Sequence, residues 1–237
     1  MDFKSEARIS KHQTIPNARI SDLADAVQVW RIPLDSVDCE RLIHHLSPDE
    51  LERAGGFHFP QDRDRFIARR GVLREVLGRY VGQTPGDLHL EYTSFGKPYL
   101  PGTPLHFSAS HSSGLALYAI SSRQVGVDLE YLRPDFPFRD IARRFFREDE
   151  IAYLDSLPAS DQHRAFFMLW TRKEAYLKAL GLGLSESLNT PNIPLTGEAR
   201  IVGPDDSTWT LTDLEVDTDY SAALISMGDR QSIRLFR

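Results

Sequence analysis

Cysteine is almost absent from this 237-residue chain, which contains only Cys39. A single thiol cannot form an intramolecular disulfide, and no Cys/His cluster accompanies it to bind zinc. No window approaches the ~20 apolar residues of a membrane span, and the first twenty residues lack the apolar stretch of a signal peptide. Low-complexity blocks and fixed-period repeats are also missing. We therefore expect a soluble cytoplasmic protein that does not associate with membranes.

An excess of basic residues is missing as well. The chain has 28 lysines and arginines against 34 aspartates and glutamates, a formal net charge of -6. This balance argues against a general nucleic-acid binder held by a basic surface. The hydrophobic content of 41% and charged content of 26% are those of an ordinary globular protein. The length allows one large domain or two small ones.

Helical and strand-like patterns occur in both halves of the chain. Ser47 and Glu50 form a capping-box pattern that predicts the start of a helix, and Gly181 is typical of a helix end. Apolar periodicity predicts helices over 62–80, 138–157 and 161–180, whereas strands are expected over 26–32, around a turn in 88–100, as a meander over 105–132, and in the tail. Without a regular βαβ rhythm, the pattern favours an α+β fold. We expect two similar subdomains, 1–122 and 123–237.

The sharpest local pattern is V-G-V-D-L-E at 125–130, in which Asp128 and Glu130 are two residues apart. Strand periodicity places both carboxylates on one face, about 7 Å apart along the strand. Two adjacent anions repel each other unless a cation lies between them, and Mg²⁺ prefers such oxygen ligands. The alternative is an amphipathic strand with a solvated acidic face.

A third acid, Glu174, lies on a helical segment between the aromatic residues Phe167 and Trp170. A carboxylate in this partly buried position must be paired, neutralised or metal-bound. The alternative is an ordinary ion pair with Lys178, four residues later. Lys173 points into the apolar arc of the same helix, so it either snorkels to solvent or binds a phosphate.

Six arginines lie between positions 63 and 79, and two of them, Arg65 and Arg69, fall inside the apolar arc of the predicted helix. A guanidinium binds phosphate through two hydrogen bonds and tolerates partial burial, so these two are candidates for phosphate binding. The alternative is an internal ion pair with Asp62 or Glu75.

Ser110 and His111 lie at the end of a predicted strand, in S-A-S-H-S-S-G at 108–114. The hydroxyl, the imidazole and the turn amides together could bind an anion, although a serine-rich turn needs no ligand. The segment lacks a G-x-S-x-G nucleophile elbow, which argues against covalent serine catalysis.

Four segments in this order resemble the 4′-phosphopantetheinyl transferases of the long, surfactin-synthetase-activating type. They are F-G-K-P-Y-L (95–100), S-A-S-H-S-S-G (108–114), V-G-V-D-L-E (125–130) and W-T-R-K-E-A-Y-L-K-A-L-G-L-G-L (170–184). The resemblance extends from about residue 47 to residue 184. It implies a monomer of two α+β halves related by a pseudo-twofold axis, with coenzyme A bound between them.

The chemistry implied by this resemblance is transfer of 4′-phosphopantetheine from coenzyme A to a serine of an apo acyl or peptidyl carrier protein. The reaction depends on Mg²⁺, with Mn²⁺ as a substitute, and releases adenosine 3′,5′-bisphosphate. By resemblance, Asp128, Glu130 and Glu174 are the metal ligands. Glu174 is also the candidate base for the serine hydroxyl, and Lys178 contacts the transferred phosphate.

The resemblance also implies a set of positions that contact coenzyme A. These are Arg53, Gly96, Lys97, Pro98, Ser110, His111 and Ser112. Arg65 and Arg69 join them from the arginine pattern above. Glu50 and Leu51 stand where relatives often have lysines, so recognition of the 3′-phosphate is expected to be weaker here or shared with the arginines.

Two other classes of function fit part of the pattern. A Mg²⁺-dependent nuclease or phosphodiesterase also combines paired acids with a glutamate and a lysine. Its lysine usually lies two residues from an acid on a strand, whereas Glu174 and Lys178 are four apart on a predicted helix. A non-catalytic module that binds coenzyme A or a carrier protein would keep the arginines and His111 but lose the acids. The presence of all three acids favours the transferase.

Overall fold

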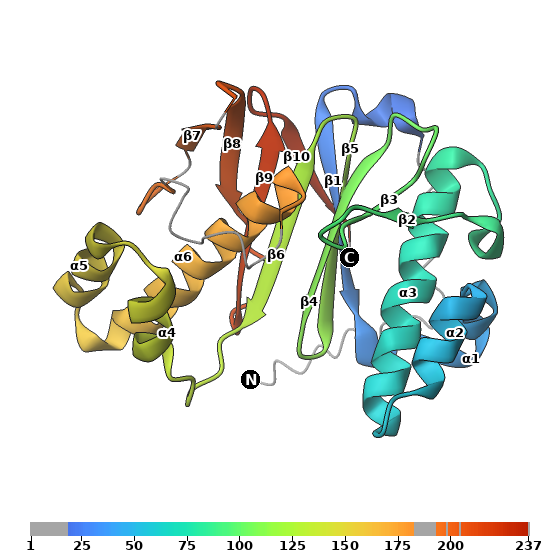
Figure 1. The fold of residues 1–237 in the computed structure, drawn as a ribbon, viewed down its shortest axis with the longest axis horizontal. Coiled ribbons are helices and arrows are strands. Elements are labelled where there is room, and N and C mark those ends of the chain that lie inside the picture. The colour runs from blue at the N-terminus through green and yellow to red at the C-terminus, as the bar shows by residue number, and fades with distance from the viewer. Residues whose placement is uncertain (1–18, 183–192, 198, 204, 237) are drawn as a thin grey trace, which may run out of the picture.

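The computed structural model describes residues 19–182, 193–197, 199–203 and 205–236. In these parts of the chain, two four-stranded sheets stand side by side and a long helix flanks each sheet (Figure 1). The two helices, α3 (Pro60–Val81) and α6 (Ala159–Leu180), have 22 residues each. The predicted α+β class is confirmed.

The first sheet has the strand order β10-β1-β5-β4. Its strands are β1 (Ala26–Pro33), β4 (His106–Ser112), β5 (Leu115–Ser121) and β10 (Ser232–Phe236). β5 is antiparallel to both of its neighbours, whereas β10 runs parallel to β1. The final strand of the chain therefore joins the first sheet. The division into 1–122 and 123–237 stays a prediction.

The second sheet has the order β6-β9-β8-β7, with every neighbouring pair antiparallel. Its strands are β6 (Val125–Tyr131), β7 (Ala199–Val202), β8 (Thr208–Asp213) and β9 (Tyr220–Met227). A separate hairpin is formed by β2 (Glu91–Tyr92) and β3 (Pro98–Tyr99), which confirms the predicted strand, turn and strand.

Shorter helices surround the two long ones. They are α1 (Cys39–Leu42), α2 (Pro48–Gly55), α4 (Phe138–Phe145) and α5 (Glu148–Ser156). Four 3₁₀ segments complete the helical elements of the described chain: Ile20–Leu23, Leu34–Ser36, Ile43–His45 and Pro85–Asp87. The predicted capping box of Ser47 and Glu50 is present at the start of α2. None of the helices in the described residues combines the length and apolarity that a membrane crossing requires.

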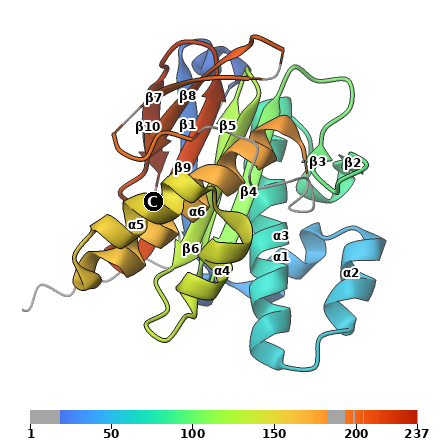
Figure 2. The same cartoon turned by 60° about the vertical axis from the view of Figure 1, so that its left-hand side comes forward.

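Each long helix packs on its own sheet. Phe66 and Val76 of α3 share a core with Trp30 of β1 and Tyr118 of β5. α6 crosses the face of β6, with α4 and α5 on its outer side (Figure 2). The crossing is close because Gly126 of β6 has no side chain: an added Cβ would lie 2.0 Å from the Ala175 oxygen. This contact brings the last two turns of α6 against the start of β6.

Two predictions about elements are wrong. The helix predicted over 138–157 is two helices, because Phe146 and Arg147 have extended backbones (ψ of 156° and 161°) and a new capping box begins at Arg147. The strands of 105–132 do not form one meander: β4 and β5 pair in the first sheet, but β6 pairs with β9 in the second.

Candidate active site

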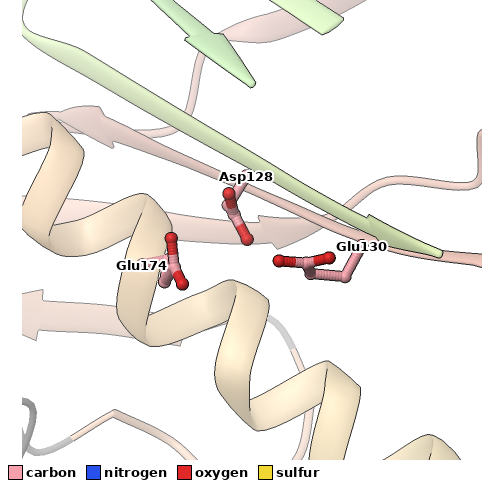
Figure 3. A group of neighbouring side chains, drawn as sticks. All are labelled: Asp128, Glu130 and Glu174. Carbon is pink, nitrogen blue, oxygen red and sulfur yellow. The ribbon is translucent and has the colours of Figure 1, made fainter. Parts of the chain in front are cut away.

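Three carboxylates meet where α6 crosses β6 (Figure 3). Asp128 and Glu130 project from the same face of β6, as their spacing predicted, and Glu174 projects from α6. One carboxylate oxygen of each residue lies within 4.8 Å of those of the other two. Asp128 is only 1% exposed, whereas Glu130 is partly exposed to solvent.

Burial and mutual repulsion raise the pKa values of two of the three acids. Burial, reinforced by the charge of Asp128, raises the pKa of Glu174 to about 8. The same two causes raise the pKa of Glu130 above its ordinary value. The buried Oδ2 of Asp128 finds no hydrogen-bond partner among the described residues. A hard divalent cation would neutralise this charge and give the oxygen a partner, so the three residues fit such an ion.

Lys178, one helical turn after Glu174, adds a positive charge beside the acids. Its Nζ donates to Asp128 Oδ1 at 2.6 Å and to Ser110 Oγ at 2.9 Å. Burial alone would lower the pKa of Lys178, but attraction by Asp128 and Glu174 outweighs burial, and the pKa is raised. The alternative of a simple helix-surface pair with Glu174 does not describe this residue, whose hydrogen bonds cross to β6 and β4.

A cavity of about 390 Å³ opens beside the acids. Arg53 and Arg69 line it, both stacked on Phe66, with guanidinium carbons 5.5 and 4.9 Å from the ring centre. His111 lies at its rim. Desolvation against the pocket wall, together with the charges of Arg69 and Lys178, lowers the pKa of His111 to about 4. The cavity therefore joins a cationic wall to the acidic cluster.

Arg65 was predicted to bind phosphate together with Arg69, but it takes no part in lining this cavity. It forms a two-pronged ion pair with Asp35, with both N···O distances at 2.7 Å. The alternative of an ion pair is therefore confirmed, but the acid is the distant Asp35 rather than a local one, and the pair lies at the surface, with the Asp35 side chain 55% exposed. Of the two inner arginines, only Arg69 faces the cavity.

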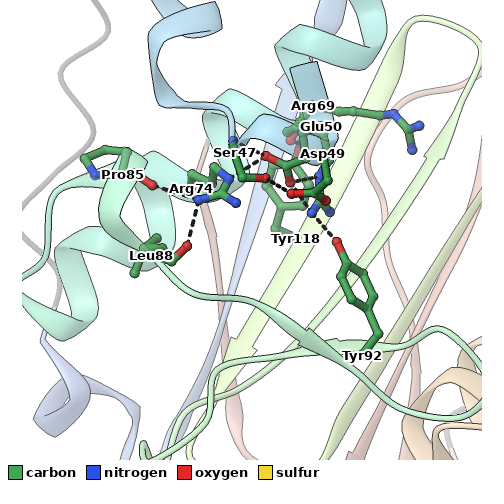
Figure 4. A network of polar contacts seen from close by, with 10 residues as sticks. Ser47, Asp49, Glu50, Arg69, Arg74, Pro85, Leu88, Tyr92 and Tyr118 are labelled. Carbon is green, nitrogen blue, oxygen red and sulfur yellow. Dashed lines mark hydrogen bonds and ion pairs between the residues drawn. The ribbon is translucent and has the colours of Figure 1, made fainter. Parts of the chain in front are cut away.

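Besides capping α2, Glu50 belongs to a buried polar network that the sequence did not indicate (Figure 4). Glu50 accepts a hydrogen bond from Arg74 Nε at 2.6 Å and pairs with Arg70. Arg70 also donates to the Tyr92 hydroxyl at 2.7 Å. This network ties the β2–β3 hairpin to α3, and it satisfies Arg70 and Arg74 internally.

Lys97 was predicted to bind phosphate. In the structure its amino group donates hydrogen bonds to main-chain carbonyls. Nζ donates to Val125 O at 3.1 Å and to Ala179 O at 3.2 Å, and burial lowers its pKa to about 8. A second cavity, of about 240 Å³, lies between Lys97 and the last turns of α6. Gly96, Pro98, Glu174 and Lys178 line both cavities, so the two cavities meet at Glu174 and Lys178, whereas Asp128 and Glu130 line only the larger one.

Two hydroxyls of β4 point at the acids. Ser110 Oγ donates to Asp128 Oδ1 at 2.8 Å, and Ser112 Oγ donates to Glu130 Oε2 at 2.8 Å. Ser110 also lines the larger cavity, but Ser112 lines neither cavity. Both serines were expected to contact coenzyme A, and their hydrogen bonds to the carboxylates were not predicted. The alternation of serines at 108, 110 and 112 was the available signal.

Lys173 neither snorkels nor reaches a cavity, contrary to both predictions for it. Its amino group is fully buried and lies 2.8 Å from Glu150 Oε1, in the first turn of α5. The partner comes from a helix that sequence analysis had merged with its neighbour. Lys173 therefore joins α5 to α6.

The site combines an acidic cluster with an adjacent lysine, where a cavity with cationic walls meets a second cavity. Such a site suits enzymes that transfer phosphate-linked groups. Comparison with known proteins gives the family. Residues 124–225 match the family model described as the 4′-phosphopantetheinyl transferase superfamily. The chain is similar to the 4′-phosphopantetheinyl transferase HetI of Nostoc, at 42% identity over 92% of this chain and 95% of that protein.

Other relatives agree. The 4′-phosphopantetheinyl transferase Sfp of Bacillus subtilis is 31% identical over 81% of this chain and 87% of its own length. A putative 4′-phosphopantetheinyl transferase of Synechocystis, slr0495, is 35% identical over 68% of each chain. The protein therefore belongs to the 4′-phosphopantetheinyl transferase family, as the four sequence segments predicted.

Proposed function

We propose that this enzyme uses Mg²⁺ or Mn²⁺ to transfer 4′-phosphopantetheine from coenzyme A to a serine of an apo acyl or peptidyl carrier protein, releasing adenosine 3′,5′-bisphosphate. The observation that carries the proposal is that Glu174 and Lys178 lie where two cavities of different character meet, with Asp128 and Glu130 beside them in the larger one. Coenzyme A has a matching division, because its pyrophosphate joins an anionic nucleotide to a neutral pantetheine arm.

The larger cavity suits the nucleotide. Arg53, Arg69 and His111 are among the cationic or hydrogen-bonding groups that line it, and guanidinium groups bind phosphate through paired hydrogen bonds. The smaller cavity suits the pantetheine arm, since Phe95, Leu177 and Leu182 give it apolar walls. With this orientation, the pyrophosphate lies beside Asp128 and Lys178.

Asp128, Glu130 and Glu174 would hold the divalent cation. The cation would supply positive charge to the pyrophosphate oxygens as the bond between the nucleotide and the transferred group breaks. Lys178 adds a second positive charge at the same place, through an amino group already held on Asp128 and Ser110. Electrostatic groups that are fixed before reaction stabilise a charged transition state with little reorganisation.

Glu174 is suited to accept the proton of the incoming serine. The serine Oγ forms a bond to the phosphorus that carries pantetheine, the bond from this phosphorus to the bridging oxygen of the nucleotide breaks, and the serine proton passes to a Glu174 carboxylate oxygen. Adenosine 3′,5′-bisphosphate leaves with the bridging oxygen. General bases of this kind are carboxylates within hydrogen-bond reach of the proton that they accept.

Our proposal also includes a monomeric, cytoplasmic enzyme with halves 1–122 and 123–237 related by a pseudo-twofold axis. In its support, the chain passes from the first sheet to the second between Ser121 and Val125. One long helix flanks each sheet, and both helices have the same length.

The test is to incubate the purified protein with coenzyme A, Mg²⁺ and several apo carrier proteins. We expect each accepted carrier to gain the mass of one phosphopantetheine, with an equal amount of adenosine 3′,5′-bisphosphate released. Carriers with alanine in place of the acceptor serine are the control and should gain nothing. Absence of any mass gain across acyl and peptidyl carriers would overturn the proposal.

A further inference from the structure

The two sheets meet at β4 and β6, which are close neighbours without a main-chain ladder between them. Among the described residues, β4 pairs only with β5, and β6 pairs only with β9. Each is therefore the edge strand of its sheet on this side. Edge strands carry main-chain N–H groups that lack ladder partners, and such groups need other acceptors when they are buried.

Three serine hydroxyls of β4 span this boundary. Ser108 Oγ accepts a hydrogen bond from Val127 N, and Ser112 Oγ accepts one from Tyr131 N, both at 3.0 Å. Between them, Ser110 Oγ accepts from Lys178 Nζ. Because the serines occupy alternate positions of the strand, all three face β6. We call Ser108, Ser110 and Ser112 the serine seam.

At its far end, the serine seam also holds a proposed metal ligand. Ser112 Oγ donates to Glu130 Oε2 at 2.8 Å while it accepts from Tyr131 N. A hydroxyl has a single proton to donate, so the main-chain bond leaves that proton directed at the carboxylate. Glu130 is thereby held by a group whose position is set by the joining of the two sheets.

We propose that Ser112 is a positioning residue that orients Glu130 for the divalent cation. The inference rests on the cation site of the proposed function. Since Ser112 lines neither cavity, it acts through Glu130 rather than by touching coenzyme A. Groups that hydrogen-bond to metal-binding side chains typically alter metal affinity 10- to 100-fold when they are removed.

Ser108 offers a matched control within the serine seam. It lies on the same strand and makes the same main-chain bond to β6, and among the described residues its hydroxyl makes no hydrogen bond to a carboxylate. Ser108 also lines the smaller cavity, so its variant is compared with Ser112→Ala by the Mg²⁺ concentration at half-maximal binding rather than by coenzyme A affinity. Ser108→Ala and Ser112→Ala therefore each remove one bond across the boundary between the sheets. Only Ser112→Ala also removes a bond to a proposed metal ligand.

The experiment measures coenzyme A binding by calorimetry over a range of Mg²⁺ concentrations, together with urea unfolding of the free proteins. We expect both alanine variants to lose similar stability. Only Ser112→Ala should need at least roughly tenfold more Mg²⁺ for half-maximal coenzyme A binding. A second pair, Ser112→Thr and Ser112→Val, separates the hydroxyl from the bulk, and the threonine variant should stay near wild type while the valine variant behaves like alanine.

Two results would overturn the role of Ser112. One is the same Mg²⁺ dependence in Ser112→Ala and Ser108→Ala, and the other is the same dependence in Ser112→Thr and Ser112→Val. So would coenzyme A binding by the wild type that does not respond to Mg²⁺. Because these measurements record binding, their failure differs from a failure of the proposed function. A protein that binds coenzyme A with Mg²⁺ but modifies no carrier would contradict the proposed function alone.

Discussion

Replacing Glu174 with glutamine should abolish transfer and yet stabilise the free protein. Burial and the neighbouring Asp128 raise the pKa of Glu174 from 4.5 to about 8, so the folded state without a cation disfavours its ionised form. In the unfolded chain the carboxylate is ionised at pH 7. By linkage, the shift corresponds to about 3 kcal/mol of lost stability at that pH. Glutamine keeps the shape and removes this cost.

The sign of the pH dependence follows from the raised pKa. Between pH 4.5 and about 8 the folded state binds more protons at Glu174 than the unfolded state does, so the contribution of this residue to stability falls as pH rises. Urea unfolding in the presence of EDTA at pH 5 and pH 8 measures the effect. The advantage of Glu174→Gln over wild type should be small at pH 5 and largest at pH 8.

A matched control is Glu75→Gln in α3, whose carboxylate forms an ion pair with Arg41. Removing that charge should destabilise the protein rather than stabilise it, because Arg41 loses its partner. An equal or lower stability of Glu174→Gln than wild type at pH 8 would refute the electrostatic argument. Near-normal carrier modification by Glu174→Gln would remove Glu174 from the proposed chemistry.

Three further predictions address other contacts. Lys178→Met should lower the transfer rate at saturating coenzyme A by about 10²- to 10³-fold, the usual effect of deleting one transition-state contact; a rate within threefold of wild type, measured by carrier mass, would contradict it. Arg74→Met should lower the free energy of unfolding in urea by about 3–5 kcal/mol, because the buried carboxylate of Glu50 loses one of its partners. An unchanged urea midpoint would contradict this and show that Arg70 compensates fully. Burial lowers the pKa of Lys97 to about 8, so the unfolded chain binds more protons there between pH 8 and 10.5. The stability of wild type relative to Lys97→Met should therefore rise with pH across this window, and a flat difference would refute the shift.

The long helices were predictable because their signals are local. Both α3 and α6 begin two residues before the predicted limit; α3 ends one residue later than predicted and α6 ends at the predicted residue. Each is followed by a glycine with positive φ, Gly82 or Gly181. The break between α4 and α5 was not predictable in this way. Phe146 continues the apolar periodicity of a helix, so the sequence pattern gives no sign of a break there. In the structure its backbone is extended and its side chain packs in the aromatic core.

In the candidate site too, features set by local sequence were predictable and contacts between distant segments were not. Asp128 and Glu130 share a face because strand geometry requires it, and the resemblance joined Glu174 to them. The partners of the other charged residues come from distant segments: Asp35 for Arg65, and Glu150 for Lys173. Periodicity indicates which side chains point inward, but it cannot indicate which segment they meet.

The serine seam shows the same limit. Alternation predicts that the three serines share a face, whereas their acceptors and donors depend on which edge of the second sheet lies opposite. Because β6 pairs with β9 in the second sheet and not with β5, β6 is the edge strand that lies opposite the serines. Close contact between α6 and β6 at Gly126 then completes the cluster of acids.

The most direct test of the account is the mass of an apo carrier protein after incubation with this enzyme and coenzyme A, with Mg²⁺ or with EDTA. The account predicts the added mass of one phosphopantetheine on the acceptor serine, located by peptide mass spectrometry, in the presence of Mg²⁺ and none with EDTA. Unmodified carriers in both conditions, or a modification that persists in EDTA, would contradict it.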